Sequence, residues 1–109
     1  MKSAVEYIDA AGRSPFRRWF DSLDARAAAK VSIAITRLEQ GNTSNLKAVG
    51  RGVSEIRIDF GPGYRVYVAQ DRDVLVILLG GGTKQRQQTD IAAAHERWAD
   101  YKRRKREQI

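Results

Sequence analysis

The sequence predicts an α+β fold in which helices surround a small antiparallel sheet. Strand-forming residues run from 52 to a Gly-Pro-Gly turn at 61–63, return, turn again at 71–73 and end in an apolar run at 74–79. This order is typical of a three-stranded antiparallel meander. Apolar residues recur at helical spacing before and after it. We expect a single domain over 1–109, long enough to bury one core.

The segments before the meander predict a short strand at 4–8 and two helices. Ser14 and Pro15 are a typical helix start, because serine caps a helix and proline fits its first position. Asp24 begins a second helix, which ends near Gly41. The aromatic residues of the first helix have core spacing, which favours packing over base stacking.

A loop is predicted from 42 to 50, between the second helix and the meander. Lys47 and Arg51 are expected to be exposed there, at the edge of the sheet. Each of these cations can equally contact a phosphate or be plain surface.

The hairpin of the meander places polar and apolar side chains on opposite faces. If it turns about Pro62, Asp59 faces Arg65 and Arg57 faces Tyr67 on one solvated face. The alternate residues then form the core face.

This polar face has two interpretations. An ordinary surface ion pair would contribute under ~1 kcal/mol to stability. A phosphate site is the alternative, because arginine has a planar fork of donors that matches phosphate oxygens. On either interpretation we expect Arg65 to lie at the surface and to contribute little stability.

The run at 74–79 is apolar on both faces, so we expect a central strand that is covered on both sides. Gly80, Gly81 and Gly82 follow it and predict a turn that could bind an anion. The spacing of a nucleotide-hydrolase phosphate loop is absent.

A C-terminal helix is expected to start in the 83–90 region and to end in a basic tail at 102–109. Such a tail is either solvated, or it binds phosphates in a way that depends on salt but not on the nucleic-acid sequence. Its candidate phosphate-binding residues are Lys102, Arg103 and Arg104.

Composition narrows the function classes. Twenty basic and 13 acidic side chains give a net charge of +7, which favours a polyanionic partner such as nucleic acid. The chain has no cysteine and one histidine, so we expect no thiolate chemistry, no metal and no cofactor. The longest apolar run is too short to span a membrane and no secretory signal is evident, so we expect a cytoplasmic protein.

Four segments resemble the RelE/ParE toxin superfamily, and within it the HigB-like branch of addiction-module killer proteins. They are S-P-F-R-R-W-F at 14–20, G-V-S-E-I-R-I-D-F-G-P-G-Y-R-V-Y at 52–67, L-V-I-L-L-G-G-G-T-K at 75–84 and D-I-A-A-A-H-E-R-W at 90–98. The second segment is the most specific of the four. Together they cover nearly the whole chain.

The resemblance implies two N-terminal helices packed on a small twisted antiparallel sheet, with a C-terminal helix. It also implies the toxin of a type II toxin-antitoxin module. The expected partner is an antitoxin from the same operon, commonly a helix-turn-helix protein, in a toxin-antitoxin hetero-oligomer.

Three activities are compatible with such a fold, because a shared fold does not settle function. RelE-like members cut messenger RNA on the ribosome without a metal, and we expect this ribosome-dependent endoribonuclease activity first. ParE-like members instead inhibit DNA gyrase. A third possibility is an inactive protein that only binds its antitoxin or operator DNA.

The resemblance also implies a catalytic set of Arg65, Lys84 and Arg57. Arg65 matches the arginine that contacts the scissile phosphate, and Arg57 matches a basic residue on the preceding strand. Lys84 best matches the cation that stabilises transition-state charge, with Arg86 as a second candidate. The wider set of expected RNA- or phosphate-binding residues is Arg86, Tyr67, Lys47, Arg51, Lys102, Arg103 and Arg104.

One departure concerns proton transfer. Asp90 stands where RelE-like enzymes often have a tyrosine, and His95 is interpreted as a surface residue. Tyr67 and Lys84 remain as candidates for moving a proton, although Tyr67 also suits a packing role.

Overall fold

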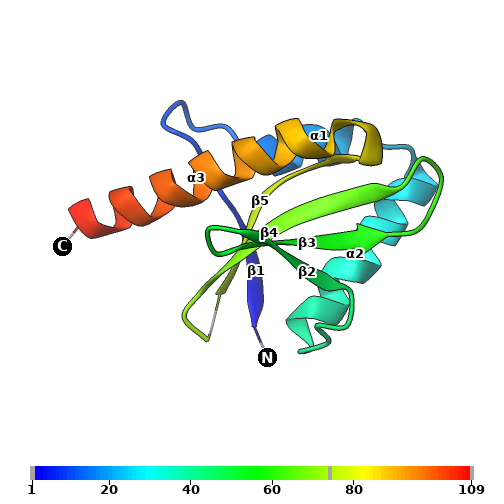
Figure 1. Cartoon of the computed structure of the whole chain (residues 1–109), viewed down its shortest axis with the longest axis horizontal. Coiled ribbons are helices and arrows are strands. Elements are labelled where there is room, and N and C mark those ends of the chain that lie inside the picture. The colour runs from blue at the N-terminus through cyan, green and yellow to red at the C-terminus, as the bar shows by residue number, and fades with distance from the viewer. Residues whose placement is uncertain (1, 74, 109) are drawn as a thin grey trace.

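The fold is built on a mixed sheet, which the computed structural model describes over residues 2–73 and 75–108 (Figure 1). Within these residues the sheet has five strands in the order β1-β5-β4-β3-β2. The elements in chain order are β1 (Ser3–Glu6), α1 (Pro15–Asp21), α2 (Ala25–Glu39), β2 (Leu46–Gly50), β3 (Val53–Ile58), β4 (Tyr64–Asp71), β5 (Leu75–Thr83), the short 3₁₀ helix η1 (Lys84–Arg86) and α3 (Gln87–Glu107). The predicted α+β class is confirmed. The predicted strand start at Val74 lies outside the described residues.

The two predicted helix starts are confirmed, each with a side-chain cap. Ser14 Oγ accepts a hydrogen bond from the Arg17 backbone N–H at 3.0 Å. Asp24 Oδ1 accepts one from the Ala27 N–H at 2.9 Å. These bonds satisfy N–H groups that the first turn of a helix leaves without partners.

Strands β3, β4 and β5 form the predicted meander, but the register of its first hairpin differs from the prediction. Arg57 lies opposite Arg65, and Glu55 lies opposite Tyr67. The turn is centred on Gly61 rather than on Pro62, and Gly61 has a positive φ of 56°. The shift is an even number of residues, so the side chains that share each face are those predicted.

Two edge strands correct the predicted topology. Residues 46–50, expected to be a loop, form β2 and pair antiparallel with β3. Arg51 and Gly52 have φ values of 55° and 82°, as in a type I′ hairpin turn, although arginine is an unusual residue there. At the other edge β1 runs parallel to β5, so the sheet is not wholly antiparallel.

The glycines at 80–82 do not form the predicted turn, because β5 continues through them to Thr83. Their lack of a side chain instead allows close packing. A Cβ atom at Gly81 would overlap the ring of Trp19 on α1, and one at Gly82 would overlap the carboxylate of Asp90 on α3. Both faces of this strand segment therefore lie against a helix.

Helices cover both faces of the sheet, so the protein has two cores. The core between the sheet and helices α1 and α2 contains Phe16, Val31, Leu38, Ile56, Val66 and Leu78, among others. The core between the sheet and α3 contains Tyr7, Tyr67, Ile77, Leu79, Ala94 and Trp98, among others. The face predicted to be solvated is therefore largely buried, because α3 lies across it (Figure 1). None of the described helices is long and apolar enough to cross a membrane.

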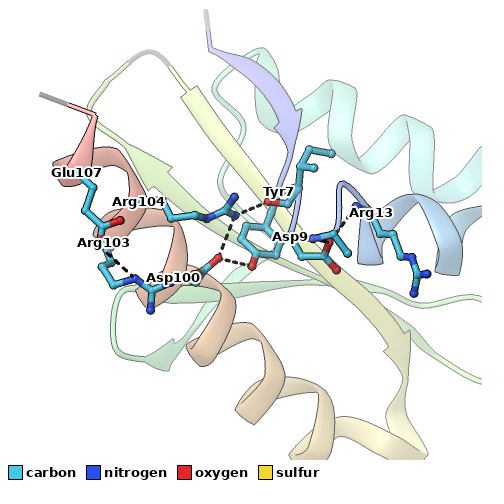
Figure 2. A network of polar contacts seen from close by, with 9 residues as sticks. Tyr7, Asp9, Arg13, Asp100, Arg103, Arg104 and Glu107 are labelled. Atoms are coloured by element: carbon cyan, nitrogen blue, oxygen red, sulfur yellow. Dashed lines mark hydrogen bonds and ion pairs between the residues drawn. The ribbon is translucent and has the colours of Figure 1, made fainter.

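The second half of α3 is fixed to the end of β1 by a polar network (Figure 2). The Tyr7 hydroxyl donates to Asp100 Oδ2 at 2.6 Å, and Arg104 pairs with the same carboxylate at 2.9 Å. Arg104 also donates to the Ile8 carbonyl. Residues 102–107, predicted as part of a tail, thus continue the helix. The last tail residue, Ile109, lies outside the described residues.

We predict that this network makes stability depend on pH through Asp100. The hydrogen bond from Tyr7, aided by the charges of Arg104 and Arg103, lowers the pKa of Asp100 in the folded protein. A lowered folded pKa stabilises the fold above the ordinary carboxyl pKa of about 3.9 and stops doing so as pH falls through the folded value. Urea unfolding should therefore show a stability deficit of Asp100→Asn at neutral pH that shrinks in acid.

Asp73→Asn is the matched control, because Asp73 is exposed in the β4–β5 turn. Its stability difference from the wild type should stay small at every pH. A deficit of Asp100→Asn that does not change with pH would contradict the assigned role of the carboxylate.

Candidate functional site

An open cavity of about 460 Å³ lies where the β3–β4 hairpin meets the end of β5. Its wall includes Arg57, Arg65 and Lys84, which are the residues predicted as catalytic, and also Lys47. Asp59 is the acidic residue in the same wall. The excess of basic side chains makes the cavity suited to an anion.

The sheet places Arg57 and Arg65 directly opposite each other on adjacent strands. Like charges in this position destabilise a sheet, so the pair has a cost that packing elsewhere must offset. Arg57 is exposed, whereas Arg65 is 5% exposed. Two guanidinium groups are thereby held at one end of the hairpin, where a bound anion would relieve their repulsion.

Lys84 reaches the cavity because its backbone is attached to the hairpin turn. Its N–H donates to the Gly63 carbonyl at 2.9 Å, just beyond the end of β5. A Cβ atom built on Gly63 would lie 3.7 Å from Lys84 Cβ and 3.8 Å from Arg65 Nη1. The Arg65 guanidinium and the base of the Lys84 side chain therefore both lie beside this glycine.

The inner side of Arg65 is paired with Glu55, a residue that no sequence pattern indicated. Arg65 Nε lies 3.5 Å from Glu55 Oε2, and the two side chains are 6% and 1% exposed. The contact is an ion pair without hydrogen-bond geometry, since Nε has no hydrogen-bond partner among the described residues. Gln87 Nε2, at the start of α3, donates to both Glu55 oxygens at 3.0 and 3.3 Å. The Glu55 carboxylate thus fixes Arg65 on the side that faces the protein interior, which corrects the expected surface position of Arg65.

Tyr67 does not lie at the cavity, which corrects its expected contact with RNA. Its ring is 1% exposed in the core under α3, and its hydroxyl has no hydrogen-bond partner among the described residues. Burial, with the nearby charges of Glu55 and Asp90, raises the pKa of the Tyr67 hydroxyl. Both its position and its pKa disfavour proton transfer to a ligand in the cavity.

Asp90 and His95, the residues discussed in connection with the missing proton-transfer group, are not part of the cavity wall. Asp90 packs over Gly82, and burial raises the pKa of its carboxyl group. His95 is half-buried rather than a free surface residue, and its Nε2 lies 3.0 Å from the Val49 carbonyl oxygen.

The remaining predicted phosphate-binding residues are spread over the molecule. Arg86 is exposed on η1, two residues beyond Lys84, and Arg51 lies at the opposite end of β2 from Lys47. Lys102, Arg103 and Arg104 lie about 22 Å along α3 from its start, at 1.5 Å per residue.

The three cations near the end of α3 already have partners in the protein. Lys102 Nζ lies 5.3 Å from the centre of the Trp98 ring. Arg103 and Arg104 both pair with Asp100. They form no common site with the cavity. Within residues 2–73 and 75–108, no cluster of His, Asp and Glu is arranged to hold a metal ion.

The burial of Arg65 predicts that the two arginines differ sharply in their contribution to stability. Arg65→Ala should lower the free energy of unfolding by about 3–5 kcal/mol, because it leaves the Glu55 carboxylate buried without a counter-charge. Arg57→Ala should change it by no more than about 0.5 kcal/mol, because Arg57 is exposed and without a salt-bridge partner in the described part of the chain. Urea denaturation of both variants measures the difference.

The double variant Glu55→Gln/Arg65→Gln is the control, since it removes both buried charges together. It should be more stable than Arg65→Ala. Equal, small effects of the two alanine substitutions would show that the buried pair does not contribute as described.

Two comparisons with known proteins show which family the chain belongs to. The family model "Phage derived protein Gp49-like (DUF891)" matches residues 18–99, a span that contains Lys47, Arg57, Arg65 and Lys84. An uncharacterized protein of Haemophilus influenzae is 48% identical over 80 residues, which cover 72% of this chain and 81% of that protein. The chain therefore belongs to the Gp49-like family of phage-derived proteins, a family associated with toxin-antitoxin systems.

Proposed function

We propose that this protein is the toxin of a type II toxin-antitoxin module and that it cleaves messenger RNA on the ribosome, as HigB-like toxins do. The observation that supports the nuclease activity best is the cavity in which Arg57, Arg65 and Lys84 converge. The family's association with toxin-antitoxin systems supports the role as a toxin. A cytoplasmic antitoxin from the same operon, of helix-turn-helix type, is the partner that this role requires.

The proposed reaction is the attack of an RNA 2′-oxygen on the adjacent phosphorus. A 2′,3′-cyclic phosphate forms as the bond between phosphorus and the 5′-oxygen breaks, and the 5′-oxygen takes up a proton. Arg65 and Arg57 would bind the non-bridging phosphate oxygens, where negative charge increases in the transition state. Arg65 is already oriented by Glu55, so little reorganisation is needed during the reaction.

Two residues of the cavity wall can move the protons. The Asp59 carboxylate is the acceptor available there for the proton of the 2′-hydroxyl, and the Lys84 ammonium can donate to the leaving 5′-oxygen. The in-line arrangement of the RNA would come from the ribosome, which fixes the messenger strand.

Inhibition of DNA gyrase is the second candidate function. It is favoured by the burial of Tyr67 and by the position of Asp90 outside the cavity wall, since both reduce the choice of proton-transfer groups. A protein that only binds its antitoxin or operator DNA is the third.

Primer extension on messenger RNA from cells that briefly express the chain tests the nuclease activity. The wild type should produce cuts within translated regions, and Arg57→Gln should reduce them by about 10²-fold or more, because a phosphate-binding cation is lost. Arg57 suits this test better than Arg65, since its substitution should leave the fold intact. Arg37→Gln, which changes an exposed arginine outside this cavity wall, is the matched control and should cut like the wild type.

The other outcomes separate the remaining functions. Growth arrest with intact transcripts would favour gyrase or another protein target. The absence of arrest would favour a protein that only binds antitoxin or DNA. Cuts that persist in Arg57→Gln would place the active site elsewhere on the protein.

A further inference from the structure

Beside the cavity, two cations from α2 lie over one aromatic ring. The ring belongs to Phe60, which directly follows the cavity residue Asp59. Arg26 Cζ lies 5.8 Å and Lys30 Nζ 5.6 Å from the centre of this ring. Figure 1 shows the β3–β4 turn beside the N-terminal half of α2, in agreement with these contacts.

The charges of these two cations are not neutralised by a carboxylate in the described part of the chain. Arg26 and Lys30 are exposed, and among the described residues no carboxylate lies within ion-pair distance of either one. Four residues apart on one helix, they repel each other by a few tenths of a kcal/mol. Phe60 is half-buried and packs against the core under α1 and α2. Its contacts with the two cations offset this cost, since a cation–π contact at an exposed site gains about 0.5–1 kcal/mol.

Some basic side chains elsewhere on the helices pair with carboxylates, whereas others, such as Arg18 and Arg37, have no ion-pair partner among the described residues. On α1, Arg17 pairs with Glu6 at 2.6 Å and lies 3.7 Å from Asp21. On α3, Arg103 and Arg104 pair with Asp100. Arg26 and Lys30 are instead distinguished by their shared contact with one ring beside the cavity, since each of the other rings that contacts a cation in the described part of the chain contacts a single one.

We propose that Arg26, Lys30 and Phe60 form a second subsite, which binds the phosphate next to the one in the cavity and so holds single-stranded RNA that flanks the cut. This proposal rests on the proposed nuclease function. Single-strand binding surfaces combine a line of cations with aromatic rings, as this surface does. An RNA strand that leaves the cavity past Asp59 meets Phe60 next. The subsite would recognise the backbone and not the base sequence.

RNA length separates this subsite from the cavity. The probes are fluorescein-labelled 2′-O-methyl RNAs, which lack the attacking hydroxyl, with two nucleotides in one probe and eight in the other. Fluorescence anisotropy gives the Kd of each probe over a range of salt concentrations. For single strands, each phosphate that a cation neutralises adds about 0.7 to the slope of log Kd against log salt.

Arg26→Gln/Lys30→Gln should weaken binding of the eight-nucleotide RNA about tenfold at low salt and lower its salt slope by roughly 0.7–1.4. It should leave the Kd of the dinucleotide within about twofold, because a dinucleotide has one internucleotide phosphate and fills the cavity alone. Phe60→Leu keeps an apolar side chain at this position but removes the ring. It should weaken the longer RNA selectively as well.

Arg18→Gln/Arg37→Gln is the matched control, since it removes the same charge from exposed positions on α1 and α2. It should leave both the affinity and the slope close to those of the wild type. Equal losses in the two double variants would overturn the subsite and indicate an effect of net charge alone. An unchanged slope in Arg26→Gln/Lys30→Gln would overturn it too.

Arg57→Gln distinguishes a failure of the subsite from a failure of the proposed function. If Arg57→Gln abolishes dinucleotide binding while Arg26→Gln/Lys30→Gln leaves both RNAs unaffected, the cavity binds RNA and the subsite alone is wrong. If the wild type binds neither RNA, or if Arg57→Gln binds both normally, the RNA-binding role of the cavity fails, and the subsite fails with it.

Discussion

The buried ion pair between Glu55 and Arg65 connects the fold to the candidate site. Moving two charges out of water is costly, so such a pair is poor evidence for stability and is better explained by the geometry that it fixes. Glu55 comes from β3, Arg65 from β4, and Gln87 at the start of α3 completes the hydrogen bonds of the carboxylate. Three elements must therefore be in place before the guanidinium is held at the cavity.

The covering of the sheet by α3 follows from the same constraint. On a solvated face Arg65 would move among several rotamers. Binding an anion would then cost the conformational entropy of fixing one of them. With α3 over this face, Arg65 is ordered in advance, while Arg57 and Lys84 remain exposed to the cavity. The network of Tyr7, Asp100 and Arg104 fixes the far end of α3 and so keeps the helix over the sheet (Figure 2).

Local chemistry made much of this structure predictable from the sequence. The helix starts at Ser14 and Asp24 depend on neighbouring residues alone, and the alternation of side chains along the strands depends only on the period of a strand. The register of the hairpin could not be predicted from the sequence, because the turn residues allow a turn centred at Gly61 or at Pro62. The role of the glycines at 80–82 could not be predicted either, since it depends on contacts with other elements. Trp19 lies far away in the sequence, and Asp90 lies on the helix that follows.

The site was predictable to the extent that its residues resemble a known pattern. Arg57, Arg65 and Lys84 were identified in this way, and they do lie together. Glu55 was not predicted as a site residue, because a carboxylate within a strand is normally expected to be solvated. Only the position of α3 shows that this one is buried. An acidic residue of this kind, on the same strand face as a predicted functional arginine, is the signal that could have identified it.

The contrast between the fixed and the exposed cations bears on the proposed nuclease function. A cavity that is open to solvent does not orient a flexible strand by itself, and orientation accounts for a large part of catalysis. In the proposed function Arg65 would supply one rigid point of contact, and the cations over Phe60 would supply a second along the strand. Two points define a direction for the backbone but not its rotation about that line. For a protein of this design, the remaining constraint has to come from whatever else holds the RNA, which is consistent with a substrate presented on the ribosome.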